Sequence, residues 1–131
     1  NHQVIFPSPA LPHPQHFFNF CLSSASLGVA PFPCRMRVLS AVTYDCLSVA
    51  NGTALSAVEL DEDLAHGAAT WAIFQAAGAV WISLESKPVF PLLPKQDYHS
   101  RYFPTLVLTR HELIPMFLPQ VQNLLHFWYN S

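Results

Sequence analysis

The side chains that could do chemistry gather in one stretch, where a cluster of acids precedes a histidine. The acids are Glu59, Asp61, Glu62 and Asp63, and the histidine is His66. On a helix, Glu62 and Asp63 would share a face with His66, where a carboxylate could raise the pKa of the imidazole or orient its ring. Acids at a helix start are ordinarily electrostatic caps, and the histidine beside them is ordinarily a half-buried surface group. His66 is therefore a candidate site residue with two interpretations. It could ligate the metal of a haem or pigment, or it could be a half-buried histidine on a helix surface.

No second signature supports a cofactor or a metal. His13 and His16 lie three residues apart, but Pro14 between them argues against the regular helix that would place both on one metal. The sequence has no nucleophile elbow, phosphate-binding loop, CxxC or HExxH pattern. The six basic residues are scattered, so nucleic acid is not an expected partner. We expect no cofactor and no metal, although a catalytic group assembled from distant positions would leave no local motif.

A long helix over residues 57–86 is predicted to position His66. Ser56 and Glu59 fit a capping box at its start, and Pro88 follows its end. Residues 67–84 carry no charge, and a helix that is apolar on most sides must be buried on most sides. Its small and aromatic side chains are therefore expected to pack against a partner. These side chains are Leu64, Ala68, Trp71, Ala72, Phe74, Ala76, Gly78 and Trp81.

Two environments suit such a helix, and the sequence leaves both open. The uncharged run approaches the roughly 20 residues that span a bilayer, but Thr70, Gln75 and Ser83 weaken its insertion as a lone span. Small residues at every fourth position would let another backbone approach closely, in water or in a membrane. Only 11% of the residues are charged and 51% are hydrophobic, which favours burial in an assembly or at a membrane over a freely soluble monomer.

The stretch around His66 also resembles a known family. His66, Gly67 and Ala68, with Gln75 nine residues after the histidine, resemble the start of the long central helix of hotdog-fold acyl-CoA thioesterases. That family has His-Gly-Gly and an acidic residue at the ninth position, and residues 52–60 would be its preceding strand. The acidic position is Gln75 here, which cannot act as a general base or nucleophile. The resemblance implies a thioesterase-like protein with altered chemistry at His66, Gly67 and Gln75, and its strand conflicts with the capping-box interpretation.

The rest of the chain divides into an arm and a small domain. Residues 1–34 contain six prolines, which block helix interiors and central strands, and are expected to form a Pro- and Phe-rich extended arm. Residues 35–131 are expected to form a single domain built on the long helix. Alternation predicts short strands at 35–44 and 105–109. An apolar stripe predicts a C-terminal helix over residues 119–129, with proline at its first position.

These observations together predict an α-rich α+β fold and a protein without catalysis of its own. The expected role is a small structural or interaction subunit that binds other protein subunits or copies of itself, in contact with a membrane or within a larger assembly. The thioesterase-like enzyme is the alternative. Asn51 and Gly52 predict a turn. Cys21, Cys34 and Cys46 are expected to be small buried residues rather than a disulfide framework.

Overall fold

A computed structural model of the chain describes residues 3–20, 34–39, 41–85, 89–98 and 101–130. In this part of the chain, five strands form one sheet and three α-helices cover it. In chain order the elements are β1 (Phe17–Phe20), β2 (Arg35–Val38), α1 (Val42–Ala50), β3 (Ser56–Asp63), α2 (Leu64–Ala77), β4 (Val80–Ser83), β5 (Tyr102–Leu108), the 3-10 turn η1 (His111–Leu113) and α3 (Ile114–Asn130).

The sheet is mixed and has β3 at its centre. Its strand order is β2-β1-β3-β5-β4. β1 pairs in parallel with both β2 and β3, whereas β5 pairs antiparallel with β3 and with β4. The register between β3 and β5 shifts between Glu59 and Glu62, which marks a bulge or irregularity just before the end of β3. The shift precedes the residue at which β3 passes directly into α2.

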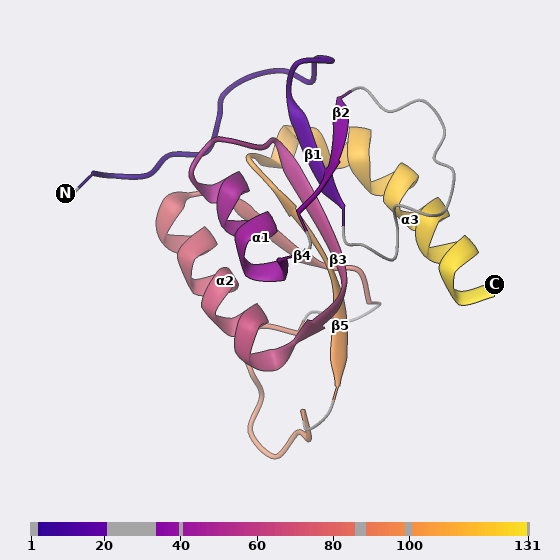
Figure 1. The fold of residues 1–131 in the computed structure, drawn as a ribbon. Coiled ribbons are helices and arrows are strands. Elements are labelled where there is room, and N and C mark those ends of the chain that lie inside the picture. The colour runs from indigo at the N-terminus through magenta and orange to yellow at the C-terminus, as the bar shows by residue number, and fades with distance from the viewer. Residues whose placement is uncertain (1–2, 21–33, 40, 86–88, 99–100, 131) are drawn as a thin grey trace.

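The helices lie on both faces of the sheet. Figure 1 shows α1 and α2 together on one face and α3 on the other. Neighbouring residues of a strand pack into different core clusters, one on each face of the sheet, because successive side chains of a strand point to opposite faces. Ala57 and Val107 pack in the cluster with Phe74 of α2, whereas Val58 and Leu106 pack in the cluster that contains α3. Both faces of β3 are therefore buried.

The long helix predicted over residues 57–86 is wrong. Its first part is the strand β3, α2 covers only Leu64–Ala77, and the chain then turns through Gly78 into the strand β4. Ser56 is no helix cap, because its hydroxyl is buried and donates a hydrogen bond of 2.7 Å to the carbonyl oxygen of Val107 in β5. Among the described residues, no helix is both long and apolar enough to cross a membrane. The fold is a mixed sheet with helices rather than an α-rich one.

The residues expected to pack against a partner are not buried as a set. Phe74 is fully buried, whereas Trp71 and Trp81 are half-buried and Ala72 and Gly78 are exposed. Leu64 and Ala68 are half-buried, and Ala76 is exposed. The expectation that this segment is hidden on nearly all sides is therefore wrong. Contact of these side chains with another protein stays a prediction.

Other predicted elements differ in their extent. The strand expected at 35–44 ends with β2 at Val38, and the chain enters α1 at Val42. The strand expected at 105–109 lies within β5, and the helix expected at 119–129 begins earlier, at Ile114, with Pro119 inside it. Part of the expected arm forms β1, which makes Phe17–Phe20 a strand of the sheet. Residues 21–33 of that arm lie outside the described residues, and so does Cys21.

Two smaller expectations can be compared directly. A turn follows α1 at Asn51 and Gly52, as predicted, although only Gly52 has a positive φ, of 87°. Cys34 and Cys46 are free thiols and both are buried, as predicted. The sequence-based prediction was thus most accurate for local features and least accurate for the long central stretch.

Candidate functional site

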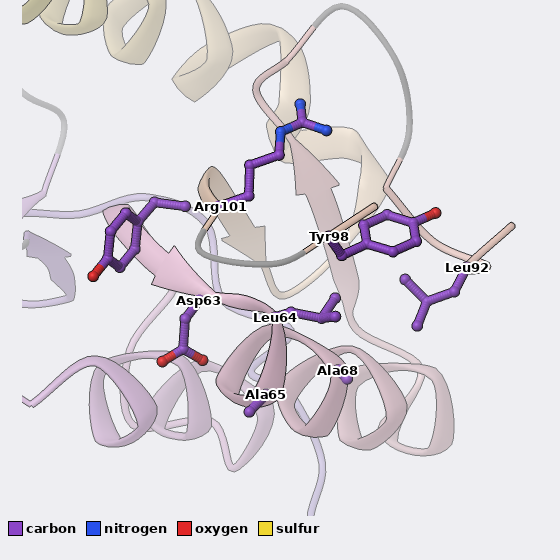
Figure 2. A pocket seen from close by; sticks show the side chains of 8 residues that line it. Asp63, Leu64, Ala65, Ala68, Leu92, Tyr98 and Arg101 are labelled. Carbon is purple, nitrogen blue, oxygen red and sulfur yellow. The ribbon is translucent and has the colours of Figure 1, made fainter. Parts of the chain in front are cut away.

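A pocket of about 620 Å³ lies beside the junction of β3 and α2. Figure 2 shows its side chains, which come from the first turn of α2, from the loop before β5 and from the start of β5. Most of the lining is apolar. The lining residues are Asp63, Leu64, Ala65, Ala68, Leu92, Tyr98, Arg101 and Tyr102.

An aromatic cluster holds the loop before β5 against α2, and residues of that loop form one wall of the pocket. The Phe90 ring stacks on Trp71 of α2, with ring centroids 5.2 Å apart and an interplanar angle of 21°. It also meets Trp81 of β4 edge-on, at 5.1 Å. Aromatic pairs with these geometries contribute roughly 0.5–1.5 kcal/mol beyond the area they bury. Leu92 and Tyr98 follow Phe90 in the same loop, and the cluster thereby places them at the pocket.

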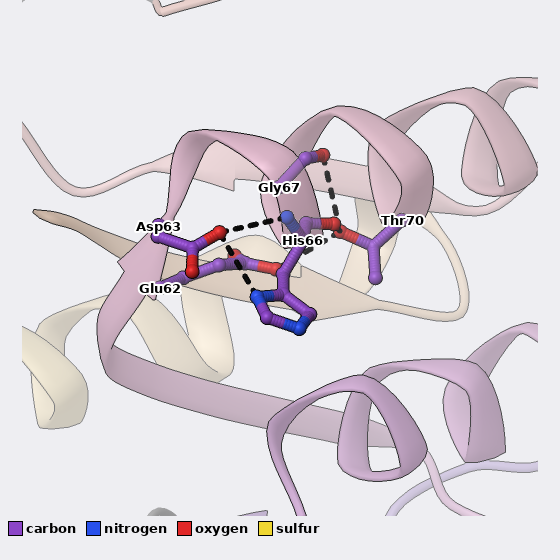
Figure 3. A network of polar contacts seen from close by, with 5 residues as sticks. All are labelled: Glu62, Asp63, His66, Gly67 and Thr70. Carbon is purple, nitrogen blue, oxygen red and sulfur yellow. Dashed lines mark hydrogen bonds and ion pairs between the residues drawn. The ribbon is translucent and has the colours of Figure 1, made fainter. Parts of the chain in front are cut away.

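Asp63 is the carboxylate of the pocket, and the fold fixes it as the N-cap of α2. Its Oδ1 accepts a hydrogen bond of 2.9 Å from the backbone N–H of His66 and lies 2.9 Å from Nδ1 of the same residue (Figure 3). The hydrogen bond from the His66 backbone lowers the pKa of Asp63, with the imidazole as a further cause. Asp63 is therefore a carboxylate near neutral pH, and it holds one nitrogen of the His66 ring.

Glu62 lies directly beneath this junction and is 1% exposed. The Thr70 hydroxyl oxygen is 3.0 Å from Oε1 of Glu62 and 3.0 Å from the carbonyl oxygen of His66 (Figure 3). Gly67 covers the Glu62 side chain, since a Cβ at Gly67 would stand 3.7 Å from it. Burial raises the pKa of Glu62, against the opposing effect of the Thr105 and Thr70 hydroxyls.

Among the described residues that line the pocket, Arg101 is the cation. One of its nitrogens donates a hydrogen bond of 2.6 Å to Oε2 of Glu85, and its guanidinium lies over the Phe103 ring, 5.1 Å from the centroid. The Arg101 side chain is 45% exposed. A guanidinium carries five N–H donors, so several remain for an anion when one is engaged by Glu85. In Figure 2 the Arg101 guanidinium and the Asp63 carboxylate do not point toward one another.

The candidate residues chosen from sequence are not assembled into one site. His66 lies next to the pocket through its contact with Asp63 but does not line it. Gly67 is a buried residue of the first turn of α2, and Gln75 is exposed near the other end of the helix, about 12 Å further along its axis. Asp63 caps a helix, but Glu59 and Glu62, which were expected to cap the same helix, are buried in β3. Arg101, Tyr98 and Leu92 were missed, because no local pattern connects them to residues some 30 positions earlier.

A metal site is not formed by the described residues. In that part of the chain, no group of three or more His, Cys, Asp or Glu side chains is placed to hold a metal ion. The rings of His13 and His16 have centroids 6.0 Å apart, and Nδ1 of His16 is 2.9 Å from the carbonyl oxygen of Leu11. This contact ties His16 to its own loop.

Comparison with solved structures gives consistent matches of fold. No family model matches the chain, and no curated protein sequence matches it. A hypothetical protein from Pyrococcus horikoshii with similarities for inositol-1 monophosphatase matches with a TM-score of 0.63 and 19% identity, over 92% of this chain and 47% of that one. An inositol monophosphatase from Zymomonas mobilis matches with a TM-score of 0.62 and 15% identity, over 89% of this chain and 46% of that one. An inositol monophosphatase–fructose 1,6-bisphosphatase matches with a TM-score of 0.61 and 18% identity, over 88% and 46%.

These matches correct the function expected from sequence. The role of a structural subunit was inferred from a long hidden helix, which the described chain does not have. The fold of the chain instead matches part of inositol monophosphatase structures. The membrane-associated interpretation loses the same support. The thioesterase alternative is also wrong, because the similar structures belong to a different family. The chain spans less than half the length of these structures and shares with them the fold of inositol monophosphatases.

Proposed function

We propose that this chain is a phosphatase-like unit and that the pocket beside the β3–α2 junction binds a phosphate ester. The observation that carries the proposal is the agreement of fold with inositol monophosphatases over about nine tenths of the chain. The similar structures include phosphatases of inositol monophosphate, fructose 1,6-bisphosphate and NADP. These substrates share a phosphate ester, and that shared group defines the ligand class proposed for this chain.

The pocket suits such a ligand in size and in lining. Small-molecule sites commonly have volumes of about 300–1,000 Å³, and this pocket has about 620 Å³. Arg101 offers a planar set of N–H donors, which matches the oxygens of a phosphate. Leu64, Leu92 and Tyr98 form an apolar wall against which the organic part of the ester can lie. The phosphate would sit at Arg101, away from the negative charge of Asp63.

The described residues do not by themselves complete a site for the divalent cation seen in some relatives. Three of the similar structures contain Ca²⁺, and Ca²⁺ takes six to eight oxygen ligands. The pocket supplies one carboxylate, that of Asp63, and no cluster of three potential ligands occurs in the described segments. We therefore propose that this chain binds the phosphate ester. Cleavage of the ester would require groups beyond those described here, because a single guanidinium stabilises little of the charge in phosphoryl transfer.

Removing the Arg101 charge tests the proposal most directly. Titration of inositol 1-phosphate, fructose 1,6-bisphosphate and phenyl phosphate would be followed by NMR shifts of the backbone amides of α2 and β5. We expect Arg101→Gln to weaken binding roughly tenfold to a hundredfold, since a charged hydrogen bond contributes about 1.5–3 kcal/mol. Arg35→Gln is the matched control, because Arg35 is exposed on β2, at the far edge of the sheet. The proposal fails if none of the esters shifts these amides or if Arg101→Gln binds them as the unsubstituted chain does.

A second pair of variants tests the apolar wall. Leu92 lines the pocket and is 44% exposed, whereas its neighbour Leu93 is 60% exposed and does not line it. We expect Leu92→Ala to weaken phenyl phosphate binding more than fructose 1,6-bisphosphate binding, because the lost methyl groups face an aromatic ring in only one of the two ligands. Leu93→Ala should leave both affinities unchanged. Equal effects of the two substitutions would place the ligand elsewhere.

A further inference from the structure

The polar side chains of the pocket come from the end of β3 and the start of β5. Asp63 and Tyr102 are paired across these strands, and Arg101 precedes Tyr102 in the chain. Oδ1 of Asp63 is engaged by the backbone and the ring of His66, and the Arg101 guanidinium by Glu85. These side chains therefore offer a ligand at most the second oxygen of Asp63, the Tyr102 hydroxyl and the remaining donors of Arg101.

The other side of the pocket is apolar. Its aliphatic members are Leu64, Ala65, Ala68 and Leu92. Figure 2 shows Leu64 and Leu92 on the same side of the pocket as the Tyr98 ring. Aliphatic side chains have neither hydrogen-bond donors nor acceptors, so they offer a ligand only apolar contact.

Tyr98 contributes its ring to this side rather than its hydroxyl. The hydroxyl oxygen accepts a hydrogen bond of 2.9 Å from the backbone N–H of Leu93 and lies 3.3 Å from Oε1 of Gln96. An amide oxygen is only an acceptor, so the hydroxyl of Tyr98 directs its hydrogen to Gln96. The part of Tyr98 that a ligand can contact is therefore the aromatic ring.

Phe103 of β5 holds the charged side of the pocket next to the apolar side. Its ring is 2% exposed, and its centroid lies 5.1 Å from the Arg101 guanidinium and 6.4 Å from the centroid of the Tyr98 ring. Both groups thus lie against one buried side chain. When the phosphate of an ester binds at Arg101, the alcohol part of that ester can reach the Tyr98 ring.

Hydroxyl groups on the alcohol part would be poorly accommodated there. A hydroxyl that leaves water for an apolar environment without a partner loses free energy. Inositol carries an oxygen on every ring carbon, and Asp63 and Tyr102 can pair with only a few of them. A hydrophobic alcohol carries no such groups and gains free energy from the apolar surface that it removes from water.

We propose that the pocket selects phosphate monoesters of hydrophobic ring alcohols, aryl and cycloalkyl, over esters of polyols such as inositol. This inference rests on the proposed binding of a phosphate ester and specifies the class of ester. It separates the chain from the inositol monophosphatases whose fold it shares. A shared fold does not fix the ligand, because specificity depends on the side chains that line the site.

A matched pair of ligands tests this selectivity. Cyclohexyl phosphate and inositol 1-phosphate have the same carbon ring and differ in the ring hydroxyls, and methyl phosphate carries the phosphate without a ring. Their dissociation constants would be measured from NMR shifts of the backbone amides of α2 and β5. We expect cyclohexyl phosphate to bind about tenfold more tightly than methyl phosphate, which corresponds to roughly 55 Å² of apolar surface removed from water. Inositol 1-phosphate should bind no more tightly than methyl phosphate, and an affinity equal to that of cyclohexyl phosphate would overturn the proposal.

Substitution of Tyr98 locates the selectivity in the pocket. Tyr98→Ala should remove most of the advantage of cyclohexyl phosphate and leave the affinity for methyl phosphate unchanged, whereas Tyr98→Phe should keep the advantage because the ring remains. Tyr44→Ala is the control, since Tyr44 lies on α1, is 60% exposed and does not line the pocket. Undiminished selectivity in Tyr98→Ala would contradict the assignment.

A measurement on the unsubstituted chain covers the case in which Tyr98→Ala does not fold. We expect nuclear Overhauser effects between the ring protons of bound phenyl phosphate and the methyl groups of Leu64 and Leu92. Their absence would place the ring elsewhere and refute the proposal.

The selectivity and the proposed function fail on different results. If no ester shifts the amides, or if Arg101→Gln binds every ester as the unsubstituted chain does, no phosphate ester binds at Arg101 and both proposals fall. If the esters bind through Arg101 but cyclohexyl phosphate has no advantage over inositol 1-phosphate, only the selectivity is wrong.

Discussion

The packing of α3 against the sheet should contribute several kcal/mol to the stability of the protein through Phe117. Phe117 of α3 is fully buried, and its ring centroid lies 5.1 Å from that of Phe18 in β1. Truncation of a buried phenylalanine to alanine costs about 3–5 kcal/mol, because transfer free energy is lost and a cavity remains. Domains of this size are stable by roughly 5–15 kcal/mol. Phe117→Ala should therefore remove about a fifth of the stability or more.

Denaturant unfolding, followed by circular dichroism and tryptophan fluorescence, would measure this loss. Met116→Ala is the neighbouring control, because Met116 is 41% exposed and its truncation should cost far less. A double-mutant cycle with Phe18→Leu and Phe117→Leu should give a coupling of about 0.5–1.5 kcal/mol for the ring pair. If Phe117→Ala cost no more than Met116→Ala, α3 would not be seated on this face of the sheet and the fold described here would be wrong in that respect.

Three further predictions concern single positions. Asp63→Ala should lower the melting temperature measured by circular dichroism, whereas Asp63→Asn should keep it, because asparagine also caps a helix N-terminus. Gly52→Ala should destabilise the chain in urea more than Gly78→Ala; both glycines have positive φ, but only a Cβ at Gly52 would meet the Phe6 carbonyl oxygen, at 2.9 Å. Equal losses would show that a Cβ at Gly52 does not meet the Phe6 carbonyl oxygen. Burial raises the pKa of Cys34 to about 11 from an ordinary 9.0, so alkylation at pH 9 should be about 50-fold slower in the folded chain than in urea, and comparable rates would show an accessible thiolate.

The sequence was informative where structure is decided locally. The turn at Gly52 depends on a backbone conformation that glycine adopts without strain. The strand around residues 105–109 is a run of β-branched and aliphatic residues, and the C-terminal helix carries a clear apolar stripe. These features need no knowledge of distant parts of the chain. They were predicted, with boundaries that differ by several residues from those of β5 and α3.

The central stretch was misinterpreted because its secondary structure depends on pairing with strands that are far away in the sequence. Ser56 and Glu59 have the spacing of a capping box, yet both are buried side chains of a central strand. Acids on a strand that is buried on both faces look in sequence like acids on a solvated helix, and only pairing with β1 and β5 separates the two. The thioesterase resemblance had the local order of strand and helix nearly right but led to the wrong family. The same dependence on distant partners explains why Arg101 was missed.

The position of β3 in the sheet has a consequence for how the chain acquires its structure. One of its neighbours, β1, lies within the first 20 residues, and the other, β5, pairs Leu108 with Ser56, 52 residues apart. The middle of the sheet therefore cannot be completed until the chain has been made as far as β5. Chains dominated by such distant pairings fold slowly and expose unpaired strand edges in the meantime. During synthesis, the emerging chain would carry β3 with its β5 edge open until residues 102–108 have left the ribosome.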